Sequence, residues 1–190
     1  MLEVRFHGRA GQGIVTAAEL LAEAAAMEGK YSQAFPFFGS EKRGPPVTSY
    51  CRIDEKAITI HEEIEEPDIV IVAEPSVMNE VNVDAGLKPN GILIINSTQS
   101  SEEFSKAGRH VFVVNGTEIA MKHLGKPITN TVMLGALCKI TGIAKLENVQ
   151  QAIRNRFPRK IAEPNIKAIE ECYNAVSEMA TEKIPIHRKH

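Results

Sequence analysis

Residues 2–29 constrain the fold more than any other stretch of the chain. Residues 2–6 alternate between apolar and polar side chains, as a half-buried strand does. A turn with three glycines follows, and residues 14–25 then place apolar side chains at helical spacing. A strand, a glycine turn and a helix in this order form the first unit of an open α/β sheet. The backbone N–H groups at such a helix start attract anions, and glycine lets a phosphate or a neighbouring chain come close.

The three glycines, Gly8, Gly11 and Gly13, have the spacing G-x-x-G-x-G. A dinucleotide fingerprint needs G-x-G-x-x-G and an acidic residue roughly 20 positions further on, but residues 32–36 contain no acid. A P-loop ends in G-K-[ST], whereas Ile14 follows Gly13 here. The spacing argues against NAD, FAD and ATP. It leaves open a tight structural turn without a ligand and a turn that receives an anion or another chain.

Three apolar runs further along predict buried strands. Residues 67–73, 91–96 and 110–115 are each rich in Ile and Val, as strands covered on both faces of a parallel sheet are, and each ends in or is followed by a polar residue. Glu74 follows the first run, at the sheet edge where open α/β folds place ligands, so it is a candidate site residue. A short helix through about residue 83 is expected to follow it.

Residues 47–60 are predicted to form an antiparallel hairpin, with 47–53 as one strand, a turn at 54–55 and 57–60 as the returning strand. Helices are predicted to begin near residue 130, to span 146–157 and to span 164–182. The fold class that follows is α/β, with three layers and a doubly wound, mainly parallel sheet that carries an antiparallel hairpin at one margin.

The chain of 190 residues is long enough for one domain, which we place at residues 1–183 with a tail at 184–190. A net charge of −2 provides no general attraction to nucleic acid or to a membrane, and no apolar run is long enough to span a bilayer. The three cysteines are far apart without a C-x-x-C pair, so no metal site or iron–sulfur cluster is expected within the chain. Free thiols of this kind indicate a reducing cytoplasm.

The loop at residues 36–46 combines phenylalanines with Lys42 and Arg43. Either the aromatic rings anchor the loop to its own core, or the loop faces a partner or an anionic ligand. His7 lies next to the glycine turn and is either a titratable site residue or a strand-end residue with a satisfied ring. No G-x-S-x-G elbow occurs, and no other self-contained catalytic set can be assembled, which favours a subunit over an independent enzyme.

Several segments resemble one family. Residues 7–13, His-Gly-Arg-Ala-Gly-Gln-Gly, are similar to the glycine turn of the gamma subunit of 2-oxoacid:ferredoxin oxidoreductases. Residues 34–36 with 38–44 resemble that family's aromatic-Gly-x-Glu-x-x-Gly loop, and residues 130–136 resemble its N-[TS]-x-M-L-G-A helix start. The resemblance covers residues 2–180 and is nearer to the pyruvate or branched-chain type than to the oxoglutarate type. Lys42 and the proline pair at 45–46 depart from the family pattern.

The resemblance implies a subunit of a complex that converts a 2-oxoacid, expected to be pyruvate, with coenzyme A (CoA) and oxidised ferredoxin into acyl-CoA, CO2 and reduced ferredoxin. Thiamine diphosphate, Mg and iron–sulfur clusters would be held by alpha, beta and delta partners, with ferredoxin as the electron acceptor. The isolated chain would be inactive, with no catalytic residue and no cofactor of its own. A CoA-binding or partner-facing surface would be made by Gly8, Arg9, Gly11, Gln12, Gly13, Lys42 and Arg43.

Two other functions stay open at this point. The chain could be a purely structural subunit that stabilises such a complex. It could also be a stand-alone module that binds a nucleotide or CoA, although the missing dinucleotide fingerprint argues against that.

Overall fold

The computed structural model describes residues 1–37, 45–105 and 108–177. The strands are β1 (Leu2–Arg9), β2 (Tyr31–Phe37), β3 (Pro46–Asp54), β4 (Ile69–Val72), β5 (Ile92–Asn96) and β6 (His110–Val114). The helices are α1 (Ile14–Met27), α2 (Gly116–Leu124), α3 (Met133–Thr141), α4 (Leu146–Arg156) and α5 (Arg159–Ser177), with two short 3-10 helices, η1 (Pro75–Asn79) and η2 (Ser101–Phe104).

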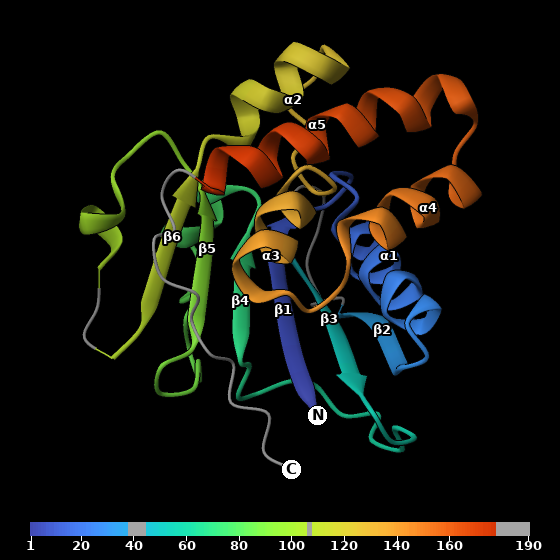
Figure 1. Cartoon of the computed structure of the whole chain (residues 1–190). Coiled ribbons are helices and arrows are strands. Elements are labelled where there is room, and N and C mark those ends of the chain that lie inside the picture. Colours follow the sequence, from blue (N-terminus) through green and yellow to red (C-terminus); the bar gives the residue numbers. More distant parts are fainter. Residues whose placement is uncertain (38–44, 106–107, 178–190) are drawn as a thin grey trace.

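The six strands form one sheet in the order β2-β3-β1-β4-β5-β6. β1, β4, β5 and β6 run parallel to one another, while β3 is antiparallel to both β1 and β2. β2 and β3 therefore form an antiparallel pair at one margin of a mainly parallel sheet (Figure 1). The predicted α/β fold class is confirmed.

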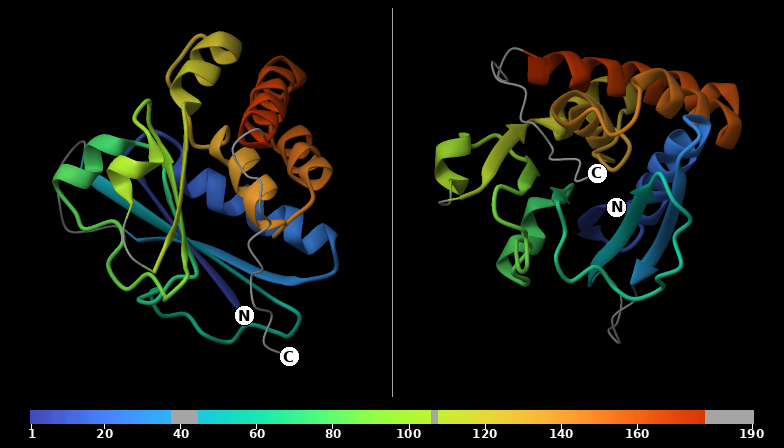
Figure 2. Two further views of the ribbon diagram at one scale, coloured as in Figure 1. Left: turned by 60° about the vertical axis from the view of Figure 1, so that its left-hand side comes forward. Right: turned by 60° about the horizontal axis from the view of Figure 1, so that its bottom comes forward.

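The two faces of the sheet are covered differently. The main apolar cluster lies between the sheet and the helices and takes residues from β1, α1 and α3 through α5. On the other face, alternate residues such as Val70 and Val72 of β4 pack against Val77 and Leu87, which belong to η1 and the irregular chain after it. Figure 2 shows the α-helices on one side of the sheet and these segments on the other. The third layer is thus irregular chain with 3-10 turns, and the helix expected through residue 83 is the shorter η1.

Arg5 fastens this irregular layer to the sheet. Its side chain is buried, and its guanidinium donates to the carbonyl oxygens of Val83 at 3.0 Å, of Ala85 and of Ile64. Buried carbonyl groups that have no regular secondary structure need such partners. One side chain of β1 therefore holds two separate irregular segments in place.

The predicted hairpin within residues 47–60 is wrong in its second strand. Residues 57–60, all within the described part of the chain, form no strand, and β2 pairs with β3 instead. The rings of Phe35 and Tyr50, which face each other in this register, lie 5.1 Å apart. Arg52, two residues further along β3, donates to the carbonyl of Glu63. This bond ties the segment after residue 60 to β3 through a side chain, and that segment does not pair with β3 as a further strand.

The predicted helix at 146–157 is confirmed as α4, but α5 begins earlier than residue 164. The carbonyl of Pro158 accepts hydrogen bonds from the N–H groups of Ile161 and Ala162, at 2.8 and 2.9 Å, so the helix starts directly after this proline. Pro164 lies inside the helix. Since proline has no N–H, one helical hydrogen bond is lost there.

Candidate functional site

The candidate site lies where the chain leaves β1 and β4 at their carboxyl ends. These strands are parallel neighbours, with Val4 beside Ile69 and His7 beside Val72. After β1 the chain enters α1 on the helical face, and after β4 it enters η1 on the opposite face. In an open α/β sheet, connections that diverge in this way leave the crevice in which ligands bind. The glycine turn lies at this point.

The turn between β1 and α1 depends on its glycines. Gly11 and Gly13 have φ values of +84° and +74°, in the left-handed region that favours glycine. A Cβ atom on Gly8 would lie 2.3 Å from Cδ1 of Ile14, so this glycine allows the first residue of α1 to close over the end of β1. A Cβ atom on Gly11 would meet nothing within 4 Å, so the space beside Gly11 is open in the part of the chain that the structure describes.

The N-terminus of α1 carries no side-chain cap among the described residues, because its N-cap position is Gly13, and its first turn contains no acidic residue. The first N–H groups of a helix have no partners within the helix, and the helix dipole makes that end positive. The α1 terminus at the switch point between β1 and β4 can therefore accept an anion.

Arg9 and Gln12 connect the turn to the chain that follows β4. The guanidinium of Arg9 donates from Nε to Oγ of Ser76 at 3.0 Å and from Nη2 to Oε1 of Glu80 at 2.5 Å. Gln12 accepts from the backbone N–H of Arg9 at 2.9 Å and donates from Nε2 to Oε2 of Glu74 at 3.2 Å. The sequence-predicted residues of the turn are thus brought together with Glu74.

The ionised groups in these contacts are one guanidinium and two carboxylates. Burial by itself would disfavour the charged form of Glu74, but the backbone N–H of Ser76 and the Gln12 amide outweigh it and lower the pKa of this carboxyl group. Glu80 is an ion-pair partner of Arg9 and is about half exposed, at 48%. A phosphate that approaches Arg9 therefore meets two carboxylates already in place. One is Glu74, which was a predicted site residue, and the other is Glu80, which no local sequence pattern indicated.

Asn130 reaches the turn from the segment before α3. Its Nδ2 donates to the carbonyl of Gly13 at 2.7 Å, and its side chain is buried, with 6% exposed. Its Oδ1 finds no hydrogen-bond partner among the residues that the structure describes. The sequence pattern marked Asn130 only as a helix start, and nothing in its local sequence points to Gly13, 117 residues away.

His7 is buried beneath the chain that follows η1. Its Nδ1 lies 3.5 Å from Oγ1 of Thr48, and its Nε2 has no hydrogen-bond partner within the described segments. Burial, together with the charge of Arg5, lowers the pKa of His7 to about 3. The imidazole is therefore neutral near pH 7 and is not a solvent-exposed acid or base. The ring is buried, with Thr48 and the backbone of Val83 beside it, so the strand-end interpretation agrees better with the structure than the titratable one.

Lys42 and Arg43 lie outside the described residues, so their place relative to the turn stays a prediction. Among the described residues, no group of three or more His, Cys, Asp or Glu side chains is arranged to hold a metal ion. None of the helices within these residues is both long and apolar enough to cross a membrane.

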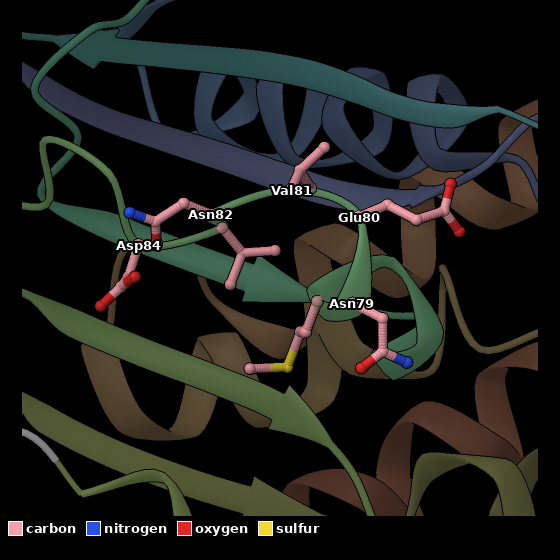
Figure 3. A pocket seen from close by; sticks show the side chains of 7 residues that line it. Asn79, Glu80, Val81, Asn82 and Asp84 are labelled. Carbon is pink, nitrogen blue, oxygen red and sulfur yellow. The ribbon is translucent and has the colours of Figure 1, made fainter.

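A surface cavity of about 380 Å³ adjoins the site and is lined by residues 78–84. Figure 3 shows Asn79 and Glu80 at one end of this segment and Asn82 and Asp84 at the other. The carboxylates in this lining belong to Glu80 and Asp84, and they form ion pairs with Arg9 and Arg109, respectively. The uncapped start of α1, which can receive an anion, lies at the turn and not in the lining of this cavity.

Comparisons with known proteins agree on one family. The sequence profile of the pyruvate ferredoxin/flavodoxin oxidoreductase family matches residues 3–175. The pyruvate/ketoisovalerate oxidoreductases common subunit gamma of Pyrococcus furiosus is 52% identical over 177 residues, which cover 91% of this chain and 96% of that protein. The pyruvate synthase subunit PorC of Methanocaldococcus jannaschii is 48% identical over 174 residues, with coverages of 92% and 96%.

A solved structure is similar over nearly the same range. The pyruvate oxidoreductase subunit PORC of Thermotoga maritima superposes with a TM-score of 0.80 at 37% sequence identity, covering 92% of this chain and 96% of that one.

Proposed function

The chain belongs to the pyruvate ferredoxin/flavodoxin oxidoreductase family as a gamma subunit of a multi-subunit oxidoreductase, and we propose that its complex oxidatively decarboxylates pyruvate with CoA. The products would be acetyl-CoA, CO2 and reduced ferredoxin. The names of the relatives from Pyrococcus furiosus and Methanocaldococcus jannaschii support pyruvate as the 2-oxoacid. The first of these names also includes ketoisovalerate, which makes that branched-chain acid the second candidate.

The finer composition of the complex belongs to the same proposal. Thiamine diphosphate with Mg and the iron–sulfur clusters would be held by alpha, beta and delta partners, and ferredoxin would accept the electrons. The state of the three cysteines supports this division. Cys51, Cys138 and Cys172 are buried free thiols, and burial raises the pKa of Cys138 and Cys172 to about 12 and raises that of Cys51 as well. Cluster ligation requires thiolates, so these side chains are unsuited to it.

The free thiols also support a cytoplasmic location, because cysteines persist in reduced form in that compartment. We further propose that residues 1–183 fold as one domain. The main apolar cluster supports this, since it draws residues from β1 at one end of the chain and from α5 at the other.

Within the complex, the glycine turn would receive a phosphate of CoA, a substrate of the reaction. The observation that carries this proposal is the uncapped N-terminus of α1 at the switch point, with Arg9 beside it. Gly8, Gly11, Gln12 and Gly13 would shape the turn, and the open space beside Gly11 would allow close approach. Lys42 and Arg43 would add positive charge from the loop outside the described residues.

The test compares the complex carrying Arg9→Ala with the complex carrying Arg154→Ala. The control removes the same charge from α4, where Arg154 is 44% exposed and pairs with Glu163. Each complex is purified anaerobically, and CoA-dependent dye reduction is measured with pyruvate, 2-oxoisovalerate and 2-oxoglutarate. Arg9→Ala is expected to raise the KM for CoA about three- to ten-fold, because a charge-assisted hydrogen bond to phosphate is lost.

The outcomes separate the possible functions. Activity on pyruvate, with a raised KM in Arg9→Ala only, supports a CoA-binding gamma subunit. If both variant complexes have normal activity and the same KM for CoA, the turn has a structural role and does not bind CoA. Recovery of the chain without partners and without activity on any of the three acids would contradict the proposed function.

A further inference from the structure

We propose that Glu80 competes with CoA for Arg9 and thereby selects for a phosphate-bearing acyl acceptor. This inference rests on the proposed function, in which the turn receives a phosphate of CoA. Glu80 occupies an edge of the Arg9 guanidinium group that a phosphate would take, and binding exchanges one anion for the other.

The contacts around Arg9 suit such an exchange. Oε1 of Glu80 lies 2.5 Å from Nη2 of Arg9, while Oγ of Ser76 accepts from Nε on the adjoining edge of the guanidinium group at 3.0 Å. Arg9 is 27% exposed and Glu80 is 48% exposed. Ser76 can thus keep the guanidinium group oriented toward the crevice after the Glu80 side chain has rotated away from Arg9.

The second carboxylate of the site is held in a different way. Glu74 accepts from the backbone N–H of Ser76 at 3.2 Å and from Nε2 of Gln12 at 3.2 Å, so neutral donors on two sides fix it. Glu80 follows η1 directly, and its side chain is about half exposed while it is paired with Arg9. Of these two carboxylates, Glu80 is the one that can leave at low cost.

The difference in charge makes the exchange selective. An exposed ion pair such as Glu80 with Arg9 favours the paired over the unpaired state by only about two- to five-fold. A phosphate monoester carries more negative charge than a carboxylate and accepts a charge-assisted hydrogen bond from an arginine, so it can displace Glu80. A carboxylate such as that of a 2-oxoacid gains nothing by replacing another carboxylate. Glu80 therefore prevents the carboxylate of a 2-oxoacid from binding Arg9, whereas a phosphate at the nucleotide end of CoA can still bind it.

The experiment uses the assembled complex with Glu80→Gln and Glu80→Ala, and with Glu62→Gln as the matched control. Glu62 is exposed and lies in the segment between β3 and β4, and its replacement removes the same charge. The KM is measured for CoA and for pantetheine, a thiol acceptor without phosphate, at low and at high ionic strength. Both Glu80 variants should lower the KM for CoA about two- to five-fold at low ionic strength and leave the KM for pantetheine unchanged.

The variants distinguish this inference from the proposed function. If Arg9→Ala raises the KM for CoA but the Glu80 variants do not lower it, the turn binds CoA and the competition is refuted. An increased KM in Glu80→Ala would also refute it, because Glu80 would then hold Arg9 in its productive orientation. If neither Arg9→Ala nor the Glu80 variants change the KM for CoA, both the competition and the proposed CoA-binding role of the turn are refuted. Equal shifts for CoA and pantetheine would exclude a phosphate-selective effect.

Discussion

Replacing Gly13 with alanine tests how the turn is built. At φ +74° and ψ 28° the residue is left-handed, and an L-amino acid there costs about 1–2 kcal/mol. The new Cβ would also lie 2.5 Å from Nδ2 of Asn130, so the amide has to move. That movement breaks the buried 2.7 Å hydrogen bond to the Gly13 carbonyl, which contributes about 1 kcal/mol. Gly13→Ala is therefore expected to lower the free energy of unfolding by about 2–3 kcal/mol.

Gly11→Ala is the matched control. Gly11 has a similar φ of +84°, but its Cβ would meet no described atom within 4 Å, so only the backbone cost of about 1–2 kcal/mol is expected. Urea unfolding of the full chain, followed by circular dichroism, measures both variants. In an Asn130→Ala background, the cost of Gly13→Ala should fall to that of Gly11→Ala. Equal losses for the two glycine variants in the natural background would refute the role assigned to Asn130.

Two further predictions concern a buried histidine and a helix contact. His7 is held neutral with a pKa of about 3, whereas the unfolded chain takes up a proton near pH 6.5, so stability is lost as the pH falls below 6.5. Between pH 7 and pH 5 the free energy of unfolding, measured with urea, should fall by about 2 kcal/mol, and His7→Gln should remove this pH-dependent loss. If the natural chain and the variant lose the same free energy over this pH range, His7 is not buried in its neutral form. In Gly135→Ala, the Cβ of α3 would lie 2.3 Å from the backbone carbonyl of Ile169 in α5, and neither backbone can yield easily. We expect a loss of about 3 kcal/mol in thermal unfolding, and a loss below about 1 kcal/mol would mean that the two helices are not in such close contact.

The elements that could be predicted from the sequence are those with a strong local pattern. β1, β4 and β5 are short apolar or alternating runs bounded by turn residues, and α1 and α4 have clear helical spacing. The choice of a strand partner is a long-range property. Residues 57–60 are rich in β-forming side chains, but β2 has the matching register and takes the place beside β3. Periodicity alone cannot decide between two such candidates.

The site shows the same division. The glycine turn and its place after the first strand could be predicted, and so could the family, which the comparisons confirm. Ser76, Glu80 and Asn130 could not, because they contact the turn from 67 or more positions away, and only after the sheet order has formed. The roles assigned to the turn residues toward CoA stay predictions.

The unequal covering of the two sheet faces has a consequence for how the molecule can move. The chain that carries Ser76 and Glu80 lies on the face with the smaller apolar cluster, and Arg5 fastens it through a few hydrogen bonds to carbonyl groups. Segments with few buried contacts open locally at a fraction of the global free energy of unfolding. Amide hydrogens in residues 75–90 should therefore exchange with solvent while those of α1 and α3 stay protected. We therefore expect this side of the crevice to adapt to a ligand or a neighbouring subunit more readily than the helical side does.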